Sequence, residues 1–142
     1  MKKNILLLLI VFLMPFCIHA QNTGQQVKSH KIIFQLSSDD TLVHKSLVRQ
    51  LHNLLNAAPG SMIEVVCLGP GLNFLVTAKT VVQDKIRELK DRSVLFLACE
   101  NTMRERNIPR DRIIPEAGFI PSGLIEIITK QEEGWVYIKG GF

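Results

Sequence analysis

Cys99 is the residue of this sequence best placed to do covalent chemistry. It follows a continuous apolar run, residues 94–98, which has the length of one strand buried on both faces. Thr102 and Glu105 follow in the S/T-x-x-E spacing of a capping box, which predicts the start of a short helix. Unpaired backbone N–H groups at a helix start favour a thiolate over a thiol. The stretch therefore predicts a nucleophilic sulfur, and the plainer alternative is an ordinary buried thiol.

The segments around Cys99 alternate between strand-like and helix-like patterns. Apolar runs of strand length occupy residues 31–36, 62–68, 94–98, 112–114 and 135–139. Between them, helical spacing of apolar residues occurs in residues 43–58, 77–90 and 124–128, a short helix is expected from Thr102, and residues 118–123 are expected to be a loop. Such alternation predicts an α/β fold with a five-stranded, mostly parallel sheet and helices on both faces.

We predict the flavodoxin-like strand order 2-1-3-4-5, in which strands one and three are neighbours. Ligands of such sheets bind at the carboxyl ends of the strands, where the order reverses. The first strand would separate Cys67 from Cys99 by about 10 Å, too far for a disulfide. Cys67 lies inside an apolar strand and is expected to be a core residue. The pocket around Cys99 would be lined by Ser38, Asp39, Gly69, Gly71, Asn101 and Thr102.

The first 20 residues have the pattern of a secretory signal peptide. Two lysines precede an apolar stretch, residues 5–16, that is too short for a comfortable membrane span, and Ala20 marks the expected cleavage site. Phe16, directly before Cys17, argues against lipid attachment at that cysteine. We therefore expect an exported, periplasmic protein without membrane attachment once the signal is cleaved.

The remaining 122 of 142 residues suffice for one domain with a single core. Residues 21–30 are polar and are expected to be a flexible leader into a domain of residues 31–142. Without the two leader lysines, 15 of the 17 basic residues remain against 13 acidic ones, a net charge of +2. This charge gives no reason to expect nucleic acid as a partner.

Other candidate motifs have plainer interpretations. Residues 69–71 lack the Lys-Ser/Thr ending of a phosphate loop, so no nucleotide or other cofactor is expected. His44 and His52 should lie on the exposed side of a helix, without acidic or cysteine partners at ligand spacing, and no metal site is expected. Trp135 and Tyr137 should share one face of the last strand. Four arginines that could hold an anionic substrate are better explained as a solvated face: Arg104, Arg106, Arg110 and Arg112.

Four longer motifs support a family resemblance. They are E-V-V-C-L-G-P-G-L at residues 64–72, L-A-C-E-N-T-M at 97–103, I-P-S-G-L-I-E-I at 120–127 and Q-E-E-G-W-V-Y-I-K at 131–139. With these motifs the chain resembles the exported single-domain branch of the DsrE/DsrF-like family of small sulfur-relay proteins. The resemblance implies a flavodoxin-like fold, homo-oligomers that are trimers or hexamers, and a reactive cysteine at the end of the third strand, which is Cys99 here.

Two main hypotheses about function follow, and both leave open whether the protein is an enzyme. In the first, the Cys99 thiolate takes sulfur from a sulfane-sulfur donor and passes it from a persulfide to an acceptor thiol. Asn101 and Thr102 would donate hydrogen bonds near the sulfur, and Ser38 or Asp39 would form the opposite wall. The alternative is a non-catalytic module that binds a small ligand or supports an oligomer. A redox-active thiol that forms mixed disulfides is a third hypothesis.

Overall fold

The computed structural model describes residues 28–141, so the expected signal peptide and most of the expected leader lie outside the described residues. Within them, five parallel strands form one sheet in the order β4-β3-β2-β1-β5. The strands are β1 (Lys31–Leu36), β2 (Met62–Cys67), β3 (Val94–Cys99), β4 (Gly118–Ile120) and β5 (Val136–Lys139). The α/β fold with a five-stranded parallel sheet is thus confirmed.

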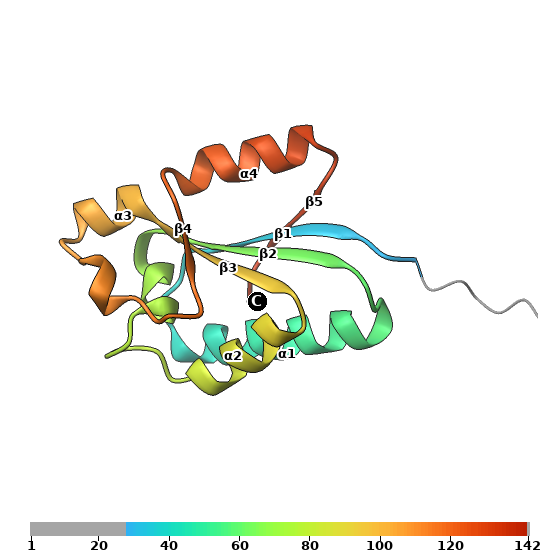
Figure 1. The fold of residues 1–142 in the computed structure, drawn as a ribbon, viewed down its shortest axis with the longest axis horizontal. Helices are drawn as coiled ribbons and strands as arrows, with labels where there is room; N and C mark the ends of the chain where they lie inside the picture. Colours follow the sequence, from blue (N-terminus) through green and yellow to red (C-terminus); the bar gives the residue numbers. More distant parts are fainter. Residues whose placement is uncertain (1–27, 142) are drawn as a thin grey trace, which may run out of the picture.

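Helices cover the two faces of this sheet unequally, as Figure 1 shows. Helices α1 (Thr41–Ala57) and α2 (Gln83–Asp91) lie on one face, and α4 (Gly123–Glu132) lies on the other. The short helix α3 (Glu100–Glu105) follows β3 directly. Two 3-10 helices complete the described chain: η1 (Gly69–Leu75) and η2 (Arg110–Arg112). None of the helices within residues 28–141 is long and apolar enough to cross a membrane.

The observed strand order differs from the predicted order 2-1-3-4-5. Strand β2 lies between β1 and β3, and β5 pairs with the free side of β1. The apolar pattern of a strand indicates how deeply that strand is buried. The order of the strands in the sheet depends instead on which strand edges pair between segments far apart in the sequence. The predicted neighbourhood of β1 and β3 was therefore wrong. The loop after β2, not the loop after β1, is the next neighbour of Cys99 along the carboxyl edge.

The predicted position of the fourth strand, residues 112–114, was also wrong. The apolar pair Ile113 and Ile114 is buried but lies outside the sheet, and β4 falls within the expected loop. Ile113 makes a single antiparallel bridge to Val76, directly before the helix expected from residue 77. This bridge follows η1, and α2 begins only at Gln83, six residues later than predicted. Val76, Ile113 and Ile114 are thus core residues that belong neither to the predicted helix nor to a strand of the sheet.

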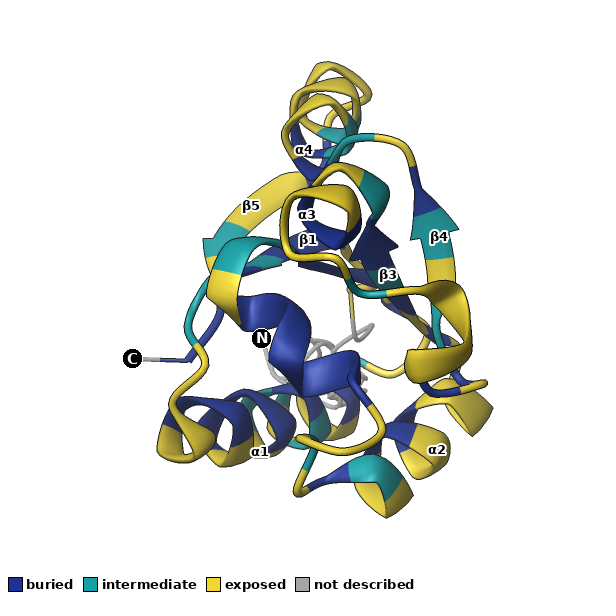
Figure 2. Ribbon diagram, turned by 90° about the vertical axis from the view of Figure 1, so that its left-hand side faces the viewer, coloured by how far each residue is buried: buried dark blue, intermediate teal, exposed yellow. Residues whose placement is uncertain are grey.

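The larger part of the core lies between the sheet and the pair of helices α1 and α2. Fully buried side chains there come from every layer, among them Leu36, Leu51, Phe74, Ile86 and Phe96. The face covered by α4 holds a smaller cluster of Ile33, Val66, Ile120, Ile127 and Trp135. In Figure 2 the inner side of α1 is buried, whereas most of α4 is exposed. Among residues 28–141, α4 is the helix that packs on this second face.

His44 corrects another expectation, because it is buried at 1% exposure and does not lie on the exposed side of its helix. Its Nε2 lies 2.8 Å from the carbonyl oxygen of Ser38, and its ring packs edge-on against Phe74. Helix α1 begins beside this contact, where the Asp40 carboxylate accepts a hydrogen bond of 2.7 Å from the N–H of Leu42. The imidazole therefore ties the first turn of α1 to the end of β1.

Candidate functional site around Cys99

Cys99 is both the last residue of β3 and the N-cap of α3. The helix begins at Glu100, two residues earlier than the capping box at Thr102 suggested. The side chain of Cys99 points to the face covered by α4, because Ala98 faces the larger core and side chains alternate along a strand. The residue is 4% exposed. The sequence therefore placed the sulfur correctly at the carboxyl edge of the sheet.

The start of α4 meets the sulfur from the other side. The backbone N–H of Gly123 donates a hydrogen bond of 3.2 Å to Cys99 Sγ. A larger residue at position 123 would crowd β2, since its Cβ would lie 2.9 Å from Val66 Cγ1 and 3.1 Å from Leu68 Cδ2. Glycine thus allows the first turn of α4 to approach β2 and β3 closely enough to reach the thiol.

Hydrogen bonds favour the thiolate form of Cys99. Burial alone would raise the pKa of this thiol. The backbone N–H groups of Thr102 and Gly123, the Thr102 hydroxyl and the N–H of Asn101 outweigh that effect, and the pKa of Cys99 is lowered. Donors from the starts of two helices thus converge on one sulfur, which is the arrangement that stabilises an anion.

Thr102 joins the thiol to the loop after β2. Its side chain is buried, and its Oγ1 accepts a hydrogen bond of 3.0 Å from the N–H of Gly69. A hydroxyl can accept one hydrogen bond and donate another, so Thr102 Oγ1 can accept from the Gly69 N–H while its O–H donates to Cys99 Sγ. Gly71 lies further along η1, where a Cβ would come within 2.2 Å of the Leu36 carbonyl oxygen. The structure therefore brings Gly69 to the Cys99 region and uses Gly71 to pack η1 on β1.

Of the remaining residues of the predicted pocket, Asn101 lies next to Cys99, whereas Ser38 and Asp39 lie at the end of a more distant strand. Asn101 is exposed in the first turn of α3, and its N–H also lies 3.2 Å from the Pro121 carbonyl oxygen. Ser38 and Asp39 follow β1, two strands away from β3. The Ser38 hydroxyl accepts from the N–H of Asp40, and Asp39 is exposed. Since β2 intervenes, a role for Ser38 and Asp39 as the opposite wall remains a prediction.

Cys67 and Cys99 are both free thiols, but the predicted reason for their separation was wrong. Cys67 pairs in register with Ala98, so the two cysteines lie on adjacent strands with no strand between them. They point to opposite faces of the sheet, since Cys67 belongs to the larger core and Cys99 faces α4. The core assignment of Cys67 is confirmed by its 0% exposure.

The arginines near α3 form an exposed group around a shallow hollow. All four that the sequence singled out are exposed, in agreement with a solvated face. Arg104 and Arg110 line the hollow together with Glu100. Arg110 pairs with the Glu100 carboxylate and lies 4.4 Å from the centre of the Phe119 ring, while Arg104 bonds Asn101. Among residues 28–141 there is no cluster of histidine, cysteine or acidic side chains that could hold a metal ion.

Gly123 is the functional residue that sequence reasoning missed. The predicted loop of residues 118–123 in fact contains β4 and ends at the first residue of α4. Ser122 followed by glycine and an apolar stripe is a helix-start signal, and it could have shown that a backbone N–H is available here. Only the tertiary packing shows that this N–H points at Cys99.

A doubly wound parallel sheet with a thiol at a strand end, held by donors from two helix starts, defines a small α/β domain with one candidate nucleophile. The sequence model of the DsrE/DsrF-like family matches residues 31–139, and the chain belongs to this family. Its fold is similar to the solved structure of MTH1491, a protein of unknown function from Methanobacterium thermoautotrophicum. The TM-score is 0.74 at 29% identity, and the match covers 78% of this chain and 99% of that one. A search of curated proteins found no match.

Proposed function

We propose that this member of the DsrE/DsrF-like family carries sulfur as a persulfide on Cys99. The carrying observation is the hydrogen bond of 3.2 Å from the Gly123 N–H to Sγ, which together with donors from α3 lowers the pKa of the thiol. A thiolate is the reactive form of cysteine toward sulfur electrophiles. The family supports a sulfur-relay type of fold, and the thiol at the strand end supplies the nucleophile that such a relay needs.

Transfer of a sulfane sulfur to the Cys99 thiolate requires no added oxidant. The Cys99 thiolate attacks the sulfane sulfur of a donor such as thiosulfate, a new S–S bond forms, the S–S bond of the donor breaks, and sulfite leaves with the electron pair. An acceptor thiolate then attacks the outer sulfur of the Cys99 persulfide and regenerates the Cys99 thiolate. The N–H donors that stabilise the thiolate before attack also stabilise it as the leaving group in the second step.

Access to the sulfur limits the donor. Cys99 is 4% exposed, and Pro121, the first residue of α4 and the first turn of α3 lie around it. A small inorganic donor is therefore a better fit than a folded protein. We also propose that the carrier works after export, since the first 20 residues resemble a signal peptide.

Intact-mass measurement tests the proposal. The chain beginning at Gln21 is incubated with thiosulfate and, separately, with polysulfide at pH 8. We expect a mass increase of one sulfur atom in the wild type and in Cys67→Ala, and none in Cys99→Ser. Absence of the adduct from the wild type, or its presence in Cys99→Ser at the same level, would refute persulfide transfer through Cys99.

A non-catalytic assembly module is the second candidate, and the outer surface of α4 favours it. Leu124, Ile125 and Ile128 are 60%, 60% and 50% exposed on that helix. Apolar side chains gathered on one helix face mark a contact surface for another protein. We infer that this face joins copies of the chain into the homo-oligomer that the family resemblance implies.

Light scattering tests the assembly. We expect the wild type to have the mass of a trimer or hexamer, Ile128→Asp to shift it toward the monomer, and Asn53→Asp to leave it unchanged. Asn53 is the control because it is exposed on α1, on the other face of the sheet from α4. A monomeric wild type, or equal behaviour of the two variants, would exclude this face as the contact between copies.

A further inference from the structure

Glu64 is a buried carboxyl group of β2 that faces α4. Its side chain is 7% exposed, and its Oε1 lies 3.4 Å from Lys130 Nζ. Its Oε2 is buried and receives no hydrogen bond from a donor among residues 28–141. The Glu126 carboxyl, one helical turn before Lys130 on α4, lies within hydrogen-bond reach of the Glu64 carboxyl. Two carboxyl groups and one ammonium therefore meet between the sheet and α4.

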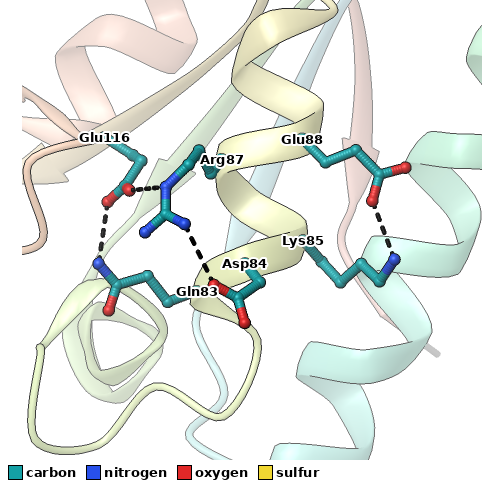
Figure 3. Close-up of polar contacts among 6 residues, drawn as sticks. All are labelled: Gln83, Asp84, Lys85, Arg87, Glu88 and Glu116. Carbon is teal, nitrogen blue, oxygen red and sulfur yellow. Dashed lines mark hydrogen bonds and ion pairs between the residues drawn. The ribbon is translucent and has the colours of Figure 1, made fainter.

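A second buried glutamate, Glu116, shows how this protein holds an ionised carboxylate. Its side chain is 6% exposed, and both of its oxygens accept hydrogen bonds from α2, as Figure 3 shows. Oε1 accepts from Arg87 Nε at 3.0 Å, and Oε2 accepts from Gln83 Nε2 at 3.2 Å. Burial alone would raise the pKa of Glu116, yet these hydrogen bonds and one from its own backbone lower it. Glu64 differs because the neighbour of its carboxyl, besides the ammonium, is a second carboxyl that has no donor when it is ionised.

The charges around Glu64 do not balance if every carboxyl is ionised. Lys130 Nζ lies 3.4 Å from Glu64, 3.8 Å from Glu126 and 3.4 Å from Glu133, so three carboxyl groups share one ammonium. Glu133 is 50% exposed, so water weakens its interactions. Two carboxylates that share a partly buried site repel each other strongly, and one of them then keeps its proton. A proton between Glu64 and Glu126 removes this repulsion and gives the buried oxygen a hydrogen bond.

The neighbouring strands bring apolar side chains to Glu64. In the sheet it lies between Ile33 of β1 and Leu95 of β3. The exposed Lys31 of β1 is opposite Met62, two residues before Glu64 on β2. Within residues 28–141, the ammonium of α4 is thus the cation at ion-pair distance from this carboxyl.

Arg92 follows α2 and lines the same hollow as Glu64, but its guanidinium is directed to α1. Its NH2 group donates to Asn56 Oδ1 at 2.9 Å, and NH1 lies 3.3 Å from His52 Nδ1. Both partners belong to the helix on the other face of the sheet from α4. Arg92 therefore does not neutralise a second carboxylate beside Glu64.

Helix α4 carries both Glu126 and the backbone donor to Cys99. Gly123, its first residue, donates to Sγ at 3.2 Å, and Glu126 follows within the first turn. Besides Gly123, Ile127 is the buried residue of this helix. A helix with so little buried apolar surface depends on its polar contacts with the sheet to stay in place.

We propose that Glu64 and Glu126 share one proton, which Glu64 Oε2 donates to the Glu126 carboxylate, and that loss of this proton to solvent at higher pH loosens α4 from the sheet. Burial raises the pKa of Glu64, and the Glu126 carboxyl raises it further against the opposing effect of Lys130. Because this pKa is raised on folding, the stabilisation is fully present below the ordinary pKa of a glutamate and is lost as the pH rises through the raised value. Neither the pair nor its test depends on sulfur transfer by Cys99.

An NMR titration with isotope-labelled glutamate carboxyl groups tests the shared proton. In the wild type we expect a titration step above that of a glutamate peptide measured alongside, with both carboxyls of the pair responding to it. Glu64→Gln should remove this step, because the amide donates permanently to Glu126. Glu126→Gln should lower the titration of Glu64, because an amide then donates to its carboxylate. No step above that of the peptide, or a step that either variant leaves unchanged, would overturn the proposal.

Hydrogen exchange measured by mass spectrometry tests the seating of α4. One pH unit above the observed step, peptides from α4 should exchange more slowly in Glu64→Gln than in the wild type, by about fivefold or more, the effect of one hydrogen bond. One pH unit below the step, the two proteins should exchange alike. Glu133→Gln is the matched control, since Glu133 contacts the same ammonium at 3.4 Å but is half exposed, and it should behave as the wild type.

Equal exchange of α4 in the wild type and Glu64→Gln above the step would overturn the link between the proton and the helix. Equal slowing in Glu133→Gln would assign the effect to charge in general and overturn it as well. Circular dichroism checks the fold of each variant. If Glu64→Gln does not fold, Glu126→Gln takes its place, because it also removes the repulsion and should slow exchange of α4 above the step.

Discussion

Two thiols on adjacent strands differ more than their positions suggest. Cys67 and Cys99 are both buried, at 0% and 4% exposure, and they are one residue out of register across β2 and β3. Burial raises the pKa of Cys67, whereas the pKa of Cys99 is lowered because backbone N–H groups and a hydroxyl outweigh its burial. Hydrogen-bond donors, and not burial alone, therefore separate a reactive thiol from a structural one.

The largest expected difference between the thiols is their rate of alkylation in the native state. Iodoacetamide should modify Cys99 far faster, and Cys67 only through unfolding, which slows it by roughly a thousandfold or more. The rate at Cys99 should rise with pH around a midpoint below that of a cysteine peptide measured alongside, because its pKa is lowered. Peptide mapping after timed quenching measures both rates.

Equal modification of Cys67 and Cys99 in folded protein would show that the two thiols do not differ in reactivity. A Cys99 midpoint at or above that of the peptide would remove the activated thiolate and leave the assembly module as the better function. The Cys67→Ala variant serves as the control, because its alkylation reports Cys99 alone.

Gly123→Ala should have the next largest effect. The added Cβ would lie 2.9 Å from Val66 Cγ1 and 3.1 Å from Leu68 Cδ2, so the start of α4 must move away from the sheet. We expect a loss of about 1–3 kcal/mol in the free energy of unfolding from overpacking. The pKa of Cys99 should rise as the Gly123 N–H withdraws from Sγ. Urea denaturation and the pH profile of alkylation measure the two changes.

Gly118→Ala is the matched control, since its Cβ would meet only the Leu97 side chain, at 3.2 Å, and Phe96 O, at 3.9 Å. Its alkylation midpoint should stay that of the wild type whatever its stability. If Gly123→Ala left the midpoint unchanged while lowering stability, the hydrogen bond to Sγ would have no part in activating the thiol.

Thr102→Val should have the smallest effect of the three. The isosteric change removes one donor to Cys99 and leaves the Gly69 N–H without its acceptor, at a cost of about 1–2 kcal/mol in the free energy of unfolding. The alkylation midpoint should rise less than in Gly123→Ala, because the backbone N–H groups of α3 remain. Thr102→Ser keeps the hydroxyl and should restore the midpoint of the wild type. Failure of serine to restore it would assign the effect to packing.

Glu64 and Glu116 are two buried carboxylates that differ in their neighbours, as the two thiols do. Glu64 lies in a strand and Glu116 outside the strands and helices, and neither position in the sequence indicates that the carboxylate is buried. Their difference arises from partners supplied by distant segments: Gln83 and Arg87 for Glu116, and Lys130 and Glu126 of α4 for Glu64. Sequence reasoning could not pair them, because each pair depends on how helices pack on the sheet.

Local patterns predicted much of the fold. The apolar run of β1 gave its bounds, residues 31–36, and the runs of β2 and β3 gave theirs to within one residue. The end of β3 placed Cys99 at the carboxyl edge, and alternation of strands and helices predicted the parallel sheet. These succeeded because strand burial and helix periodicity are written in consecutive residues.

Only the tertiary structure decided what surrounds those elements. Strand order placed Gly69, and not Ser38, next to Cys99, and the packing of α4 brought the Gly123 N–H to Sγ. His44 and Glu64 were buried by contacts with segments far along the chain. The sequence by itself determined that a thiol ends an apolar strand, although the prediction that both faces of this strand are buried was wrong, because Leu95 is 53% exposed. Whether that thiol meets donors depends on long-range packing, which no local spacing of residues encodes.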